Sequence, residues 1–205
     1  MITEGCLAEL YLLPPIAFFK ETKGFESVMY EKENHFVKQT YRNRFTILGA
    51  NTIQTITIPV DKSTKKQFYK DVKINYAENW LAKNSTALKS AYSNSPFFDD
   101  YYPFFQKVLN KKHTYLFELN LELIELCFKA LQLDKIINTT SSFKESYTGL
   151  SDFRENSTSK KKNPTDWKQD DIKSYQQVFG NKFVSNLSII DLIFCEGPMS
   201  INYLT

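Results

Sequence analysis

The sequence predicts a single α+β (or α/β) domain over residues 1–205. It is expected to have mostly antiparallel strands and a hairpin at its N-terminal end, a helical middle and a short C-terminal helix. Three observations lead to this class. Short β-prone runs separated by turn residues fill the first third of the chain, helical periodicity begins near residue 80, and a short apolar run with capping signals ends the chain. Strands followed by helices are typical of α+β domains, whose strands pair mainly antiparallel.

The first third of the chain contains short strand candidates. Residues 7–13 form an apolar run that ends at Pro14 and Pro15, because proline cannot donate to a β-ladder and restricts the residue before it. Residues 16–19 are predicted to form a helical turn. Further short strands are expected at 26–31, 36–39 and 71–74.

Residues 39–60 are predicted to form a β-hairpin with two arginines at its entrance. Turn residues lie between Gly49 and Asn51, and apolar residues alternate with threonines after them. Side chains in a strand alternate between faces, so Arg42 and Arg44 are expected on one face. Two fixed guanidinium groups would form a clamp for a carboxylate or phosphate. The alternative is a solvated face of an antiparallel pair, since charged residues are usually exposed.

The middle of the chain is predicted to be helical. Apolar residues recur at helical spacing from Trp80 onward. Ser95 followed by Pro96 is a signal for the start of a second helix, and Pro103 is expected to kink or restart it. The longest helix is predicted at 120–133.

The last third combines a polar region with a well-specified helix. Residues 139–171 are rich in serine, threonine, lysine and asparagine and are predicted to be a mobile loop region, with 156–163 as its disordered part. Ser188 and Asp191 then match an S-x-x-D capping box at the start of a short buried helix, 189–196. Asp191 is therefore expected to have a structural role.

Composition excludes several classes of protein. A net charge of +3 without a dense basic patch argues against nucleic-acid binding. Three widely spaced cysteines predict neither a disulfide framework nor a zinc site, and no apolar run is long enough to span a bilayer. A cytoplasmic protein without membrane insertion is expected. His35 and His113 lack neighbours at metal-ligand spacing and the six glycines do not cluster, so neither a metal nor a cofactor is expected.

Several segments together resemble the WbqC-like protein family. They occur in the family's order and cover most of the chain. The segments are LLPPIAFF (12–19), YRNR (41–44) with TIPV (57–60), VKI (72–74) before Trp80, SPFF (95–98), NLEL (120–123), YQQ (175–177) and NLSIIDL (186–192). The resemblance implies an α/β-type bacterial protein associated with surface-polysaccharide synthesis. It also implies transfer of an acyl or aminoacyl group to an amino sugar.

One hypothesis is a transferase that acts on an anionic, nucleotide-linked sugar. In this hypothesis Arg42 and Arg44 hold phosphate or carboxylate, Asn43 orients the substrate, and Glu9 is the candidate catalytic base. Secondary substrate-binding candidates are polar residues in or near the matched segments and the polar region: Tyr11, Asp152, Arg154 and Gln177.

The chain also departs from the pattern that it resembles. Family members commonly carry a His-Gln pair ahead of a Leu-Pro-Trp element, whereas this chain has Ala8 and Glu9 in those positions and Pro15 in place of the tryptophan. An enzyme would need a replacement base in the same cleft. The alternative is a non-catalytic binding or accessory protein with a protein partner. An exposed aromatic patch within 97–105 would favour that alternative.

Overall fold

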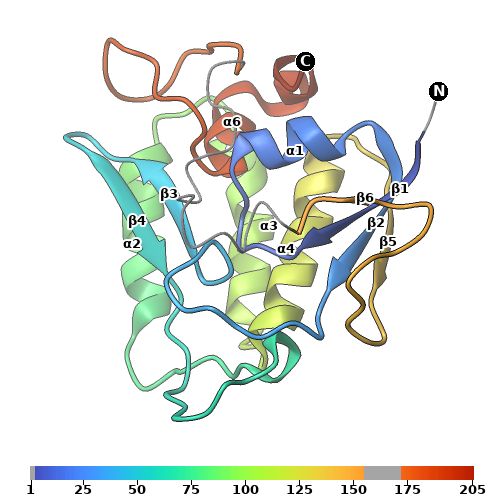
Figure 1. The fold of residues 1–205 in the computed structure, drawn as a ribbon. Coiled ribbons are helices and arrows are strands. Elements are labelled where there is room, and N and C mark those ends of the chain that lie inside the picture. The colour runs from blue at the N-terminus through green and yellow to red at the C-terminus, as the bar shows by residue number, and fades with distance from the viewer. Residues whose placement is uncertain (1–2, 155–171) are drawn as a thin grey trace.

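The computed structural model describes residues 3–154 and 172–205, and it contains a four-stranded parallel sheet. The strand order is β5 (Ile136–Thr139), β2 (Phe25–Glu31), β1 (Thr3–Glu9) and β6 (Ser151–Asp152). Residues Glu9 and Glu31 are opposite each other in the β1–β2 register. The last residues of the two central strands therefore meet at one edge of the sheet (Figure 1).

The connection between β1 and β2 explains why this sheet is parallel. Helix α1 (Ile16–Thr22) returns the chain to the end of the sheet at which β1 began, so that β2 runs in the same direction as β1. The predicted helical turn at 16–19 is the first part of this helix. The α+β class is confirmed, but the antiparallel pairing predicted for the N-terminal strands is corrected to parallel, apart from the hairpin.

The predicted hairpin is present. Strand β3 (Arg44–Leu48) pairs antiparallel with β4 (Ile53–Thr57), and Figure 1 shows this pair apart from the parallel sheet, with helices between them. Residues Phe45, Ile47 and Ile56 are buried in the core, as the alternation of strand side chains requires.

Four more helices fill the rest of the described fold. They are α2 (Trp80–Tyr92), α3 (Phe98–Asn110), α4 (Leu116–Ala130) and α6 (Ile189–Glu196). Two 3₁₀ helices are also present, η1 (Tyr69–Asp71) and the longer η4 (Gly197–Tyr203). Phe194 of α6 packs edge-on against the rings of Tyr92, Phe98 and Phe105, so that the C-terminal helix joins α2 and α3 in one core. No helix in the described ranges is long and apolar enough to cross a membrane.

Several local predictions differ from the structure. Residues 36–39 and 71–74 form no ladder strand; Gln39 has a positive φ of 64°, and Val72–Ile74 contains only isolated bridges. Strand β6 lies inside the predicted polar region, and β5 ends at its first residue, Thr139. Neither was predicted, because each is short and its pairing partner is distant in sequence. The segment predicted to be disordered, 156–163, lies outside the described residues.

The expected helix caps are made differently. The hydroxyl of Ser95 donates to the carbonyl of Tyr92, at the end of α2, and α3 then continues through Pro103 without a restart. Ser188 precedes α6 but makes no side-chain capping bond, because its hydroxyl donates to the carbonyl of Leu13 at 2.8 Å. The capping box predicted with Asp191 is therefore wrong.

Candidate functional site

Two buried glutamates end the central strands of the parallel sheet. Glu9 is the last residue of β1 and Glu31 is the last residue of β2. Both side chains are 0% exposed. In open sheets of parallel strands, ligands bind outside the carboxyl ends of the strands. We call these two residues and the side chains that contact them the carboxyl-edge site.

Glu9 is held by an arginine and an asparagine. Arg42 donates from Nη2 to Oε2 of Glu9 at 2.6 Å, and Asn34 donates from its amide to Oε1 at 3.0 Å. The other terminal nitrogen of Arg42 donates to the carbonyl of His35 at 2.6 Å, and the guanidinium lies 5.2 Å from the ring centroid of Tyr69. The charge of Arg42 is thus used inside the protein, on Glu9.

A second layer fixes the position of Arg42. The amide of Asn120, from α4, donates to the carbonyl of Arg42 at 2.7 Å and to the hydroxyl of Tyr69 at 2.5 Å. That hydroxyl donates in turn to the carbonyl of Leu10 at 3.0 Å. Burial raises the pKa of Tyr69 well above its ordinary value, so the hydroxyl keeps its proton and stays a donor. This chain of bonds ties the end of β1 to η1 and α4.

Glu31 has its own set of donors. Arg154 donates from Nη1 to Oε2 at 3.0 Å, while the hydroxyl of Thr140 and the main-chain amide of Glu33 donate to Oε1 at 2.7 and 2.8 Å. Arg154 also forms an ion pair with Asp152, with 2.6 Å between Nη2 and Oδ2. The two glutamates therefore each have one arginine, and the two arginines are far apart in the sequence.

The rim of the carboxyl-edge site is partly exposed and aromatic. The guanidinium of Arg154 lies 5.3 Å from the ring centroid of Phe143 and 5.5 Å from that of Tyr147. Lys70 pairs with Glu33 at 2.6 Å, and 39% of the Lys70 side chain is exposed. The rim thus offers rings, donors and acceptors to a molecule approaching from solvent.

Asp152 is the most accessible carboxylate that contacts an arginine of this site. Its partial burial alone would raise its pKa, but the hydrogen bonds and charge of Arg154 outweigh this effect, and the pKa lies below its ordinary value. The same contacts raise the pKa of Arg154. A carboxylate with a lowered pKa is a weak base, so Asp152 is suited to accepting hydrogen bonds from a ligand rather than to removing its proton.

The two arginines of the predicted clamp and Asn43 between them have different surroundings. Arg42 and Asn43 lie in a turn before β3, so strand alternation does not extend to Arg42. The amide of Asn43 donates to the carbonyl of Ile58 at 3.1 Å, which ties the two arms of the hairpin together. Arg44 is half-buried, and its Nε has no hydrogen-bond partner. The structure therefore does not bring Arg42 and Arg44 together on one strand face.

Two other candidates lie outside the carboxyl-edge site. Tyr11 is buried, with its ring edge-on to Phe18 and Tyr41, so it packs in the core. Gln177 is also buried and binds Val184 through both ends of its amide, each at 2.9 Å. Gln177 is therefore a residue that positions a loop.

Gln177 also takes part in a buried cluster around Asp191. The carboxylate accepts hydrogen bonds from the hydroxyls of Tyr92 at 2.9 Å and Tyr175 at 2.5 Å, and from the amide of Gln177 at 3.0 Å. Burial raises the pKa of Asp191, although these three donors lower it in part. Asp191 has a structural role, as predicted, but it joins helices and loop rather than capping one helix.

Sequence reasoning missed three members of the carboxyl-edge site, Glu31, Asn34 and Thr140, and the two residues that hold Arg42 from behind, Tyr69 and Asn120. The available signal was that Glu31, like Glu9, follows an apolar strand. Using it required the parallel register, which places the two glutamates opposite each other. Within the described residues no group of histidine, cysteine and carboxylate side chains could hold a metal ion. His113 pairs with Glu122 of α4 at 2.9 Å, and both side chains are partly buried.

Fold and site together define the class: an α+β protein with a parallel sheet whose carboxyl edge holds paired, buried charges. The sequence model of the WbqC-like protein family matches residues 10–152 and 145–203. The chain belongs to the WbqC-like protein family, which confirms the resemblance found in its sequence segments. No curated protein and no solved structure matches the chain.

Proposed function

We propose that the protein is a transferase that binds a nucleotide-linked amino sugar at the carboxyl-edge site and transfers an acyl or aminoacyl group to it. One observation carries the choice of site. Four charged side chains, those of Glu9, Glu31, Arg42 and Arg154, are at most 8% exposed where two parallel strands end. Buried ion pairs are often no more stabilising than apolar residues of similar volume, so stability alone gives little reason to keep two of them here.

The balance of charge supports a sugar rather than a bare anion as the ligand of this site. Each arginine is matched by a carboxylate, and Lys70 is matched by Glu33. Such a set of donors and acceptors complements sugar hydroxyl and amino groups, which both donate and accept. The rings of Phe143 and Tyr147 at the rim add apolar faces on which a sugar or a base can stack.

The transfer step follows from the chemistry of an amine and an activated acyl donor. The sugar nitrogen attacks the acyl carbonyl carbon, a C–N bond forms, and the bond from that carbon to the leaving group breaks with its electron pair. The nitrogen loses one proton. Glu9 is the predicted base, but its side chain is 0% exposed and bound to Arg42, so in this role it would act only after a shift of that pair. The residues of the site would otherwise act by binding and orienting the sugar.

An exposed aromatic patch within 97–105 would have favoured the accessory-protein alternative. Three aromatic residues of this segment, Phe98, Tyr102 and Phe105, are buried, and Phe104 is the one large apolar side chain there that is mostly exposed, at 58%. A single exposed phenylalanine is ordinary on a protein surface. This segment therefore gives no support to a partner-binding role.

The proposal is tested by ligand-induced thermal stabilisation. The panel contains nucleotide-linked amino sugars, the same nucleotides linked to neutral sugars, and the free nucleotides. We expect an amino sugar nucleotide to raise the unfolding midpoint, because a ligand of the folded state alone stabilises it. We also expect Asp152→Asn to reduce that shift, since it weakens the rim carboxylate and its contact with Arg154.

The matched control is Asp100→Asn, which removes an exposed carboxylate on α3. It should leave the ligand-induced shift unchanged. Mass spectrometry of the sugar, incubated with the protein and acyl donors, then tests transfer separately. A protein stabilised equally by free nucleotides and by amino sugar nucleotides would contradict recognition of the sugar, and binding without any gain of acyl mass would contradict the transferase assignment.

A further inference from the structure

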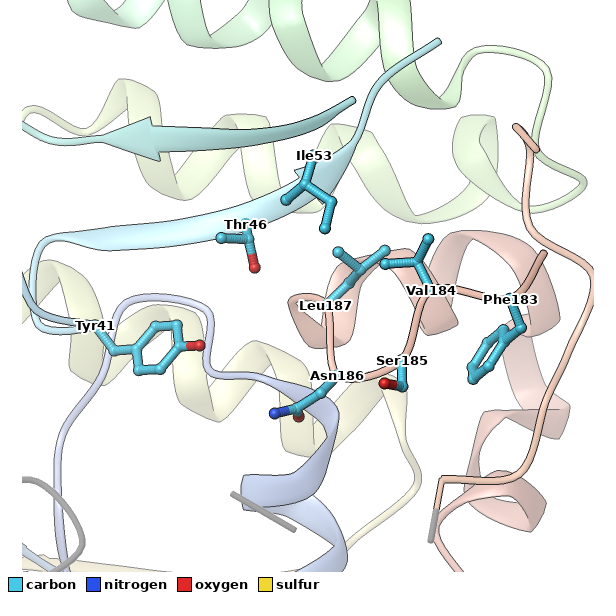
Figure 2. A pocket seen from close by; sticks show the side chains of 8 residues that line it. All are labelled: Tyr41, Thr46, Ile53, Phe183, Val184, Ser185, Asn186 and Leu187. Atoms are coloured by element: carbon cyan, nitrogen blue, oxygen red, sulfur yellow. The ribbon is translucent and has the colours of Figure 1, made fainter. Parts of the chain in front are cut away.

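A cavity of about 380 Å³ lies between the hairpin and the segment before α6 (Figure 2). It shares no residue with the carboxyl-edge site, since none of the paired glutamates or arginines lines it. The hairpin side contributes Tyr41, Thr46 and Ile53. The other side consists of Phe183, Val184, Ser185, Asn186 and Leu187.

Hydrogen bonds hold the far wall of this cavity in place. Gln177 binds both the amide and the carbonyl of Val184, and the side chain of Asn186 accepts from the amide of Ala17 at 3.1 Å. Asn186 has a positive φ of 57°, which asparagine tolerates better than most residues. The amide of Ser188 donates to the carbonyl of Thr46 at 3.0 Å and so joins this wall to β3. The cavity is therefore formed before any ligand binds.

The lining divides into an apolar end and a hydroxyl end. Figure 2 shows Ile53, Leu187 and Val184 close together, while the hydroxyl of Tyr41 points into the cavity from the opposite end. Burial raises the pKa of Tyr41 to about 12, so this hydroxyl is a donor at neutral pH. Thr46 lies between the two ends. A ligand that fits has a short apolar tail and a polar head.

A cation lies on the hairpin face that contributes Thr46 to the lining, although it is not itself one of the lining residues. Arg44 precedes Thr46 by two positions on β3, so both side chains lie on the same face of the hairpin. The Nε of Arg44 is buried without a hydrogen-bond partner. An unpaired buried donor on a charged group is costly, and a bound anion would remove that cost.

We propose that this cavity is a binding site for a short acyl group joined to an anionic head, with the tail at Ile53 and Leu187 and the head at Arg44 and Tyr41. Its role as the place of the acyl donor rests on the proposed function, whereas binding itself does not. Tyr41 is adjacent to Arg42, whose guanidinium contacts Glu9, so the cavity and the carboxyl-edge site are joined by consecutive residues. A phosphate-linked and a coenzyme-linked acyl group share this chemistry.

The test is titration with stable analogues, followed by amide chemical shifts of the folded protein. Butylphosphonate represents the phosphate-linked group, S-butyl coenzyme A represents the thioester, and butyramide is the neutral probe. We expect one of the two anions to bind and to shift the amides of residues 183–187. Arg44→Gln should weaken its binding about tenfold, as loss of a charge-assisted hydrogen bond does, and should leave butyramide unaffected.

Matched variants separate this site from general surface effects. Lys66→Gln is the control for Arg44→Gln, because it removes an exposed lysine elsewhere. Val37→Ser is the control for Ile53→Ser, because the two side chains are 52% and 49% exposed. Ile53→Ser should weaken binding and the two controls should not. Unchanged affinity in both Arg44→Gln and Ile53→Ser, or shifts confined to other residues, would overturn the proposal. Binding of an anionic probe in this cavity without recognition of amino sugar nucleotides would support the cavity as a binding site and contradict the proposed transferase function.

Discussion

Arg42 is the residue on which the buried charges of the carboxyl-edge site depend most. It supplies the only cationic group in contact with Glu9 among the described residues, and its own position is fixed by Asn120 and the carbonyl of His35. The sequence singled out Arg42 for an external anion, whereas the structure uses it on an internal one. The reason is that the turn before β3 directs Arg42 toward the end of β1.

We expect Arg42→Met to lower the free energy of unfolding by about 3–5 kcal/mol, because it leaves the Glu9 carboxylate buried without its cation. Adding Glu9→Gln should recover part of this loss, since the uncompensated charge is then gone. Urea unfolding of the two single variants and the double variant measures the coupling. Lys83→Met is the matched control, because the Lys83–Glu78 pair is exposed and should contribute little. Additive losses from Glu9→Gln and Arg42→Met would mean that the pair is not coupled.

Much of the residue-scale description could not be obtained from the sequence. Glu9 was predicted as a candidate base, and the structure places it at the end of β1, paired with Arg42. Glu31 was not predicted, since its cation lies 123 positions away, at Arg154. Contacts at that separation depend on strand order, and no local pattern encodes strand order.

At the scale of elements, α6 connects the C-terminal end of the chain to the rest of the core. The sequence predicted this helix at its observed bounds, 189–196, although the capping box with Asp191 that marked its predicted start is not formed. It did not predict the parallel sheet, because the choice between a hairpin and a crossover depends on a seven-residue helix, α1, that begins directly after two prolines. The polar Asp191 cluster was also hidden, since its donors come from α2 and the loop around Gln177.

Asp191 should give the protein a pH-dependent stability of a definite sign. Its folded pKa is raised by burial, so just above the ordinary carboxyl value of about 3.9 the folded state binds more protons than the unfolded state. The contribution of Asp191 to the free energy of unfolding therefore falls as pH rises through that window. Asp191→Asn lacks this titration. The free energy of unfolding of the wild type minus that of the variant should therefore decrease from about pH 4 upward. Urea unfolding at a series of pH values measures this difference, and Asp100→Asn is the control. A difference that does not change with pH would show that folding does not raise the pKa of Asp191.

Gly197, at the end of α6, should not tolerate a side chain. It has a positive φ of 51°, and a Cβ there would lie 2.5 Å from an atom of the Phe97 ring. We expect Gly197→Ala to lower the free energy of unfolding by about 1–3 kcal/mol from backbone strain alone, with the ring contact adding to it. Gly24→Ala is the control, because a Cβ at Gly24 meets nothing within 4 Å. Equal thermal midpoints for the two variants would contradict this description of the helix end.

For the whole molecule, the fold places two different chemical environments near one another. The carboxyl-edge site has balanced charges and aromatic rings at its rim. The cavity beside the hairpin has an apolar end, and the buried Nε of Arg44, on the same hairpin face as Thr46, has no hydrogen-bond partner. The family match spans both regions. The sequence could identify the family from its ordered segments. It could not separate the two environments, because Arg42 and Arg44 are neighbours in sequence and have different surroundings in the fold.

The most direct test of the carboxyl-edge site is to map where an amino sugar nucleotide binds, using amide chemical shifts of the labelled protein. The predicted result is a set of saturating shifts at residues 31–35, 140–154 and 69–70, with smaller shifts elsewhere. If the saturating shifts occurred at another surface and not at these residues, they would contradict the assignment of the sugar site to the carboxyl ends of β1 and β2.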